Sequence, residues 1–117
     1  MLMSLSNLKV YVSTKATDMR KSFDSLANEV LITHNSDPSN GSLYVFFNKN
    51  LSSVKMLLWE EGGYWIYYRR LEKGKFVKPI SSENRESIKI SSQDLSLLLD
   101  GIELKEVQQK ERYKRYS

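Results

Sequence analysis

Residues 54–70 read VKMLLWEEGGYWIYYRR, and this stretch decides the fold. Side chains at 54, 56 and 58 alternate with those at 55, 57 and 59, and residues 64–70 are rich in aromatic side chains. Both features are typical of β-strands. Between the two halves, Glu61-Gly62-Gly63 tolerates the positive φ angles of a tight turn. The stretch therefore predicts an antiparallel hairpin at the centre of a sheet.

Upstream of the hairpin, residues 19–33 predict an amphipathic helix, preceded by the N-cap types Thr17 and Asp18. The apolar residues recur at helical spacing: Phe23, Leu26, Ala27, Val30 and Leu31. We expect this stripe to pack on one face of the sheet. If Phe23 is fully buried there, truncating it to alanine costs about 3–5 kcal/mol.

The remaining elements are shorter. Residues 8–13, 43–47, 76–77 and 88–90 predict strands, and a capping-box-like start at Ser91 predicts a short C-terminal helix that ends near Gly101. A strand, a helix, a run of strands and a second helix, in that order, indicate an α+β fold, a mostly antiparallel sheet with its helices on one face. We expect one globular domain over 1–103 and a charged C-terminal tail over 104–117.

Composition excludes several classes of protein. The 117 residues include no cysteine, which excludes disulfides, thiolate metal sites and cysteine nucleophiles. The longest uncharged run, 38–48, is too short to span a bilayer, and the first residues lack the basic start of a signal peptide. We therefore expect a cytoplasmic protein.

The net charge of +4 is concentrated in two places. Residues 49–78 hold seven basic side chains against three acidic ones, and residues 104–117 hold five against two. Clustered Lys and Arg favour polyanionic partners such as nucleic acid, although many small domains carry such a charge without that role.

No arrangement of residues predicts catalysis. The single histidine, His34, has no neighbouring metal-ligand partner, and its place at the end of the predicted helix favours a capping role. Asp18 and Asp24 are poorly spaced for a shared metal ion, and no glycine-rich phosphate loop occurs. We expect a protein that is not an enzyme and that needs no cofactor and no metal.

Six segments in register resemble the TnpB-type accessory protein of insertion sequences of the sixty-six family. The clearest are TDMRKSFDSL at 17–26, DPSNG at 37–41, RLEKGKF at 70–76 and LLDGI at 98–102; LYVFFN at 43–48 and VKMLLW at 54–59 complete the set. The resemblance as a whole covers residues 8–103. Ser25, Ser39 and the loop 49–53 depart from the family pattern, and the loop has fewer basic residues than the family's. The resemblance implies a helper protein encoded beside a transposase and used in transposition.

Two hypotheses follow for the molecular role. In the first, the protein binds the DNA backbone through basic residues of the first helix and of the hairpin: Arg20, Lys21, Arg69, Arg70, Lys73 and Lys75. For Arg20, an ion pair with Asp24 one helical turn later is an equal alternative. In the second hypothesis, the protein is an adaptor that binds the transposase or another helper. A contiguous basic face favours the first, and an exposed apolar patch favours the second.

Overall fold

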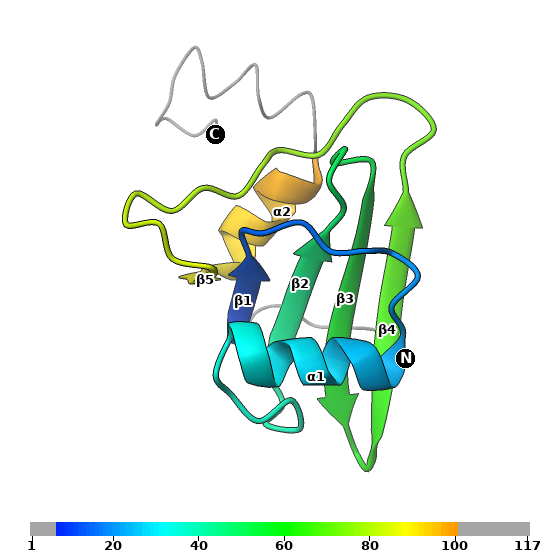
Figure 1. Ribbon diagram of the computed structural model, residues 1–117, viewed down its shortest axis with the longest axis vertical. Helices are drawn as coiled ribbons and strands as arrows, with labels where there is room; N and C mark the ends of the chain where they lie inside the picture. Colours follow the sequence, from blue (N-terminus) through cyan, green and yellow to red (C-terminus); the bar gives the residue numbers. More distant parts are fainter. Residues whose placement is uncertain (1–6, 101–117) are drawn as a thin grey trace.

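The computed structural model describes residues 7–100, which form a five-stranded sheet covered on both faces (Figure 1). Along the chain, the strands are β1 (Val10–Ser13), β2 (Leu43–Phe47), β3 (Ser53–Glu60), β4 (Gly63–Arg70) and β5 (Ser87–Ile90). The helices are α1 (Phe23–Thr33), which connects β1 to β2, and α2 (Ser92–Leu99), which follows β5. The structure does not describe residues 1–6 and 101–103 of the expected domain, nor the expected tail 104–117.

The strand order is β4-β3-β2-β1-β5, and the predicted α+β class with a mostly antiparallel sheet is confirmed. The pairs β4/β3, β3/β2 and β1/β5 are antiparallel, whereas β1 and β2 run parallel. A parallel pair needs a crossover connection, and α1 provides it. The hairpin β3–β4 forms, with positive φ at Glu61 and Gly62. Its expected place at the centre of the sheet is wrong, because β4 is an edge strand and β2, not the hairpin, lies in the middle.

The two helices lie on opposite faces, so the expectation that both would share one face is wrong. Leu26 and Val30 of α1 pack with Tyr44, Phe46 and Leu57. On the other face, Leu95 of α2 packs in a larger cluster: Val10, Val12, Leu43, Val45, Phe47, Val54, Met56, Leu58 and Phe76. Because β2 is covered on both faces, all five of its residues are buried, which explains its uninterrupted apolar sequence LYVFF.

The helix α1 is shorter than the sequence predicts, and fewer of its residues are buried against the sheet. It begins at Phe23, with Ser22 rather than Asp18 as its N-cap, and the Ser22 backbone N–H donates to Ser25 Oγ at 2.9 Å. Phe23 is 46% exposed and Leu31 is 52% exposed. The buried stripe is only Leu26 and Val30 with the half-buried Ala27, because successive helix residues are about 100° apart and Leu31 turns away from the sheet.

The predicted strand at 76–77 does not form. Instead the Phe76 backbone N–H donates to Leu51 O at 2.8 Å, and its buried ring lies 5.5 Å from that of Phe47. The chain from 71 to 86 therefore covers the end of the sheet as an irregular segment before it enters β5 (Figure 1).

Candidate nucleic-acid interface

The two arginines at the end of β4 point to opposite faces of the sheet. In the β3–β4 register, Arg69 lies opposite Val54 and Arg70 lies opposite Ser53, and neighbouring strand residues alternate between faces. On the α2 side, Arg69 Nη1 donates to Leu99 O at 3.4 Å, and the guanidinium lies 5.8 Å from the Phe76 ring centroid. The predicted basic run is therefore split between two surfaces.

Arg70 lies on the α1 side and forms an ion pair with Glu72, with 3.1 Å between Arg70 Nη2 and Glu72 Oε2. Both side chains are more than two-thirds exposed. Exposed pairs of this kind are weak, since water and salt screen them, so the Arg70 guanidinium can exchange Glu72 for another anion.

Arg20 lies in the loop that precedes α1, and its side chain is 91% exposed. It pairs with Asp18: Nη2 is 2.6 Å from Oδ2, and Nε lies 3.1 Å from both carboxylate oxygens. Hydrogen bonds from the Arg20 side chain and backbone lower the pKa of Asp18 to about 2. The alternative pairing of Arg20 with Asp24 is wrong, because the helix begins after Arg20 and no helical turn joins the two residues.

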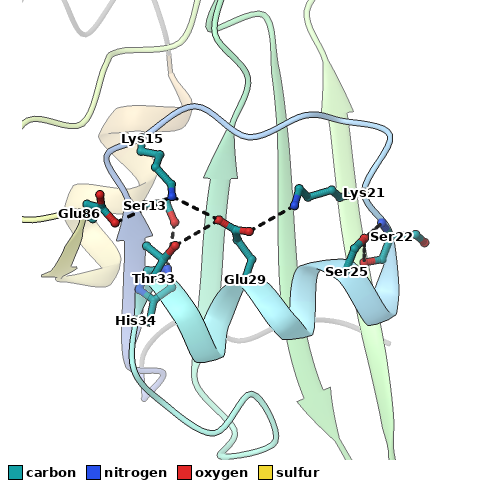
Figure 2. Close-up of polar contacts among 9 residues, drawn as sticks. All are labelled: Ser13, Lys15, Lys21, Ser22, Ser25, Glu29, Thr33, His34 and Glu86. Carbon is teal, nitrogen blue, oxygen red and sulfur yellow. Dashed lines mark hydrogen bonds and ion pairs between the residues drawn. The ribbon is translucent and has the colours of Figure 1, made fainter.

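Lys21 is held by Glu29, which lies between two lysines (Figure 2). Glu29 Oε1 accepts a hydrogen bond from Lys21 Nζ at 3.2 Å, and Glu29 Oε2 accepts one from Thr33 Oγ1 at 3.1 Å. Lys15 Nζ lies 3.7 Å from the same Oε2. Burial raises the pKa of Glu29, but these hydrogen bonds and the lysine charges outweigh burial, and the pKa is lowered. Lys15 also lies 3.9 Å from Glu86. This network fixes the loop 14–22 to α1 and to the segment before β5.

Lys55, on β3, holds the Lys21 backbone against the sheet. Its Nζ donates to Lys21 O at 2.7 Å and lies 4.7 Å from the ring centroid of Tyr68, although the residue is only 8% exposed. Tyr68 is two residues before Arg70 on the same face of β4. The structure thus places Lys21 over β3 and β4, on the face that carries Arg70, and it separates both from Arg69.

Lys73 and Lys75 lie in an exposed turn anchored at both ends. The Leu71 backbone N–H donates to Ser52 O at 2.7 Å, and that of Phe76 donates to Leu51 O at 2.8 Å. Within residues 7–100, neither lysine has an ion pair or hydrogen bond. These are the sequence-predicted cations whose charge is least compensated.

Two further exposed lysines lie at the same end of the sheet. Lys49 is in the turn between β2 and β3, and Lys78 follows the segment that Phe76 anchors. Neither has a partner among the described residues. Both fall in the basic block 49–78, but sequence alone does not place them side by side, because it does not reveal that 71–80 folds back beside the turn 48–52.

Comparison with known proteins identifies the family of this chain. A family model described as IS66 Orf2-like protein matches residues 8–109. The chain belongs to the IS66 Orf2-like family. Among curated proteins, it is 38% identical to the protein y4hO of Sinorhizobium fredii over 93% of each chain. It is also 27% identical to y4jC of the same organism, over 88% of this chain and 86% of that one. No solved structure matches it.

Membership of the IS66 Orf2-like family makes this chain an accessory protein of an insertion sequence. In this family member, His34 is a structural residue: it follows α1 as its C-cap, is buried, and contacts Ser13 Oγ at 3.0 Å and Ser87 Oγ at 2.6 Å. Between residues 7 and 100, no three His, Asp or Glu side chains gather as a metal site would require. Over the same residues, neither helix has the length and apolar character needed to cross a bilayer.

Proposed function

We propose that this IS66 Orf2-like protein assists transposition without catalysing it. It does so by binding the DNA backbone through basic residues at the end of β4 and in the turn that follows: Arg69, Arg70, Lys73 and Lys75. The observation that carries the proposal is the pair of uncompensated lysines, Lys73 and Lys75, in an exposed turn that directly follows Arg69 and Arg70. Phosphate oxygens are the natural partners of such cations, and the charge they provide is independent of base sequence.

Arg20 and Lys21 extend the proposed contact surface on the α1 side. Both are engaged with carboxylates, Arg20 with Asp18 and Lys21 with Glu29, so they join a phosphate contact by sharing or exchanging those partners. The Arg20 pair is highly exposed and exchanges readily, whereas Glu29 is largely covered and keeps Lys21 in place. Arg20 is therefore the stronger contributor of the two.

The test is duplex binding across a salt series. Five phosphate contacts, from Arg20, Arg69, Arg70, Lys73 and Lys75, contribute about −4 to −5 to the slope of log K against log salt. The double variant Lys73→Gln/Lys75→Gln makes the slope less steep by about two units. The matched control, Lys9→Gln/Lys89→Gln, removes the same charge just before β1 and within β5, and it leaves the slope unchanged.

Base sequence is the second variable of this experiment. Substituting these lysines or arginines lowers the protein's affinity for element-end and unrelated duplexes equally, because phosphate contacts position a protein without specifying bases. Absence of duplex binding by the wild-type protein at about 50 mM salt contradicts the proposal.

One observation favours the adaptor as a second candidate. The outer side of α1 exposes Leu31 and Ile32, which are 52% and 65% exposed and adjacent in sequence. In the adaptor hypothesis this side binds the transposase. The adaptor hypothesis is supported if this protein and the transposase co-purify, and if co-purification is lost in Leu31→Ser/Ile32→Ser but retained in Lys73→Gln/Lys75→Gln. Retention of co-purification in both variants contradicts the hypothesis.

A further inference from the structure

A small pocket lies where the parallel strands β1 and β2 end. Its walls come from the loop after β1, the turn after β2 and the segment before β5, and its lining residues are Ser13, Thr14, Lys15, Ala16, Phe47, Asn48, Lys49, Leu51, Lys78 and Pro79. The carboxyl ends of parallel strands are where open sheets bind ligands, since the connections diverge there and leave a crevice. The pocket is separate from the six cations of the proposed interface.

The charge of this pocket is entirely positive. Three lysines line it, and no Asp or Glu is among its lining residues. Lys15 is partly compensated by Glu29 and Glu86, at 3.7 and 3.9 Å. Lys49 and Lys78 have no partner within residues 7–100. Two free ammonium groups thus face a shared hollow with no counter-charge in its wall.

The rest of the lining is held firmly in place. Asn48 Oδ1 accepts from the backbone N–H groups of Ser52 and Ser53, at 2.9 and 3.0 Å, and its amide donates to Ser52 Oγ. Thr14 donates through its hydroxyl to Arg85 O at 2.7 Å and through its backbone N–H to Glu86 O at 3.0 Å. The pocket walls are therefore preorganised, and only the lysine side chains need to move to meet a ligand.

The size of the pocket restricts its ligand. Its volume of about 140 Å³ is several times that of one water molecule, about 30 Å³, but below the about 300 Å³ at which pockets for drug-sized molecules begin. A phosphate group fits within this volume. A wider hollow of about 330 Å³ adjoins it, shares Thr14, Lys78 and Pro79, and extends to Arg85.

We infer that this pocket binds a single phosphate group, held by Lys49 and Lys78 with Lys15 behind them. In its DNA form the inference rests on the proposed function: the phosphate is one of the duplex backbone, and the neighbouring hollow carries the strand past Arg85. The same chemistry admits a free phosphate, which the experiment below distinguishes from the backbone.

The test uses the full chain and the double variant Lys49→Gln/Lys78→Gln. Both residues are exposed and unpaired, so the variant retains the wild-type melting temperature. Duplex binding across a salt series shows a slope less steep by about two units than that of the wild type. The control Lys9→Gln/Lys89→Gln has the same net charge and keeps the wild-type slope. In a second arm, inorganic phosphate is titrated against chloride at equal ionic strength, and amide NMR shifts at residues 13–16 and 48–49 are recorded.

The outcomes separate the two proposals. Duplex binding with equal slopes in the test and control variants overturns the pocket's role on DNA and leaves the proposed function standing. If the wild type does not bind duplex but phosphate shifts the pocket amides, the proposed function fails and the pocket is a free-phosphate site. If neither duplex nor phosphate binds, both proposals fail.

Discussion

His34 is the buried titratable residue that joins three elements. Its ring contacts Ser13 on β1 and Ser87 on β5, and it packs against the rings of Tyr11, Tyr44 and Phe46. Burial lowers its pKa from 6.5 to about 4, and the nearby Glu29 carboxylate opposes this only in part. A neutral imidazole is therefore part of the folded state.

This pKa shift makes stability depend on pH. A proton binds the unfolded chain near pH 6.5 but the folded chain only near pH 4, so acid favours unfolding between these values. We expect the free energy of unfolding to fall by about 3 kcal/mol between pH 7 and pH 4 through His34. Urea denaturation at several pH values measures it. A His34→Gln variant, less stable at pH 7, lacks this component; an identical pH profile in both proteins contradicts the assignment.

Leu26 and Phe23 give a second prediction, because they are one helical turn apart with different burial. Leu26 is fully buried and Phe23 is 46% exposed. Leu26→Ala therefore costs about 2–5 kcal/mol, and Phe23→Ala costs about 1 kcal/mol, less than the sequence alone suggests. Denaturant midpoints of the two variants measure the difference. Equal losses show that Phe23 contributes to the core despite its exposure.

Among the elements, the β3–β4 turn offers a test with a built-in control. Glu61 and Gly62 have φ of 51° and 86°, the left-handed pair that suits a two-residue hairpin turn. A Cβ on Gly62 or Gly63 meets no atom within 4 Å, so only backbone strain distinguishes them. Gly62→Ala costs about 1–2 kcal/mol, and Gly63→Ala, outside the left-handed region, costs under about 1 kcal/mol. Thermal unfolding compares them, and a larger loss in Gly63→Ala contradicts this view of the turn.

The elements that sequence predicts well are those whose determinants are local. The hairpin follows from alternation and Glu61-Gly62, and α1 follows from Leu26 and Val30 at helical spacing. The start of α1 is mispredicted because Asp18 is as good an N-cap type as Ser22, and a neighbouring contact decides between them: Arg20 takes the Asp18 carboxylate. Whether the Phe23 side chain is buried or exposed is likewise decided by how α1 lies on the sheet, which the spacing of apolar residues does not determine.

At the scale of the whole molecule, strand order is the part that sequence does not predict. The parallel pairing of β1 with β2 and the placement of β5 beside β1 join residues up to about 80 positions apart. The arrangement of the candidate interface depends on strand order in the same way, so the sequence does not predict it. Its composition is visible as a basic block, but the division of Arg69 from Arg70 and the meeting of Lys15, Lys49 and Lys78 depend on register and topology.

The last prediction concerns the charged C-terminal residues 111–117. Both core clusters of the described part, residues 7–100, lie between Leu8 and Leu99, and we expect the seven charged and polar C-terminal residues to add little to them. They hold three basic side chains and one acidic one, a net charge of +2. Deleting them changes the free energy of unfolding by less than about 0.5 kcal/mol, a shift in melting temperature of at most about 4 °C.

The same deletion weakens DNA binding by a purely electrostatic route, and the salt slope becomes less steep by up to about three units if all three cations contact phosphates. The full-length control Arg112→Gln/Lys114→Gln/Arg115→Gln separates charge from chain length, and we expect it to match the deletion in both melting temperature and salt slope. A fall of many degrees in the deletion, but not in this control, shows that the C-terminal residues pack on the core. In that case the stability of the domain depends on more of the chain than the two clusters contain.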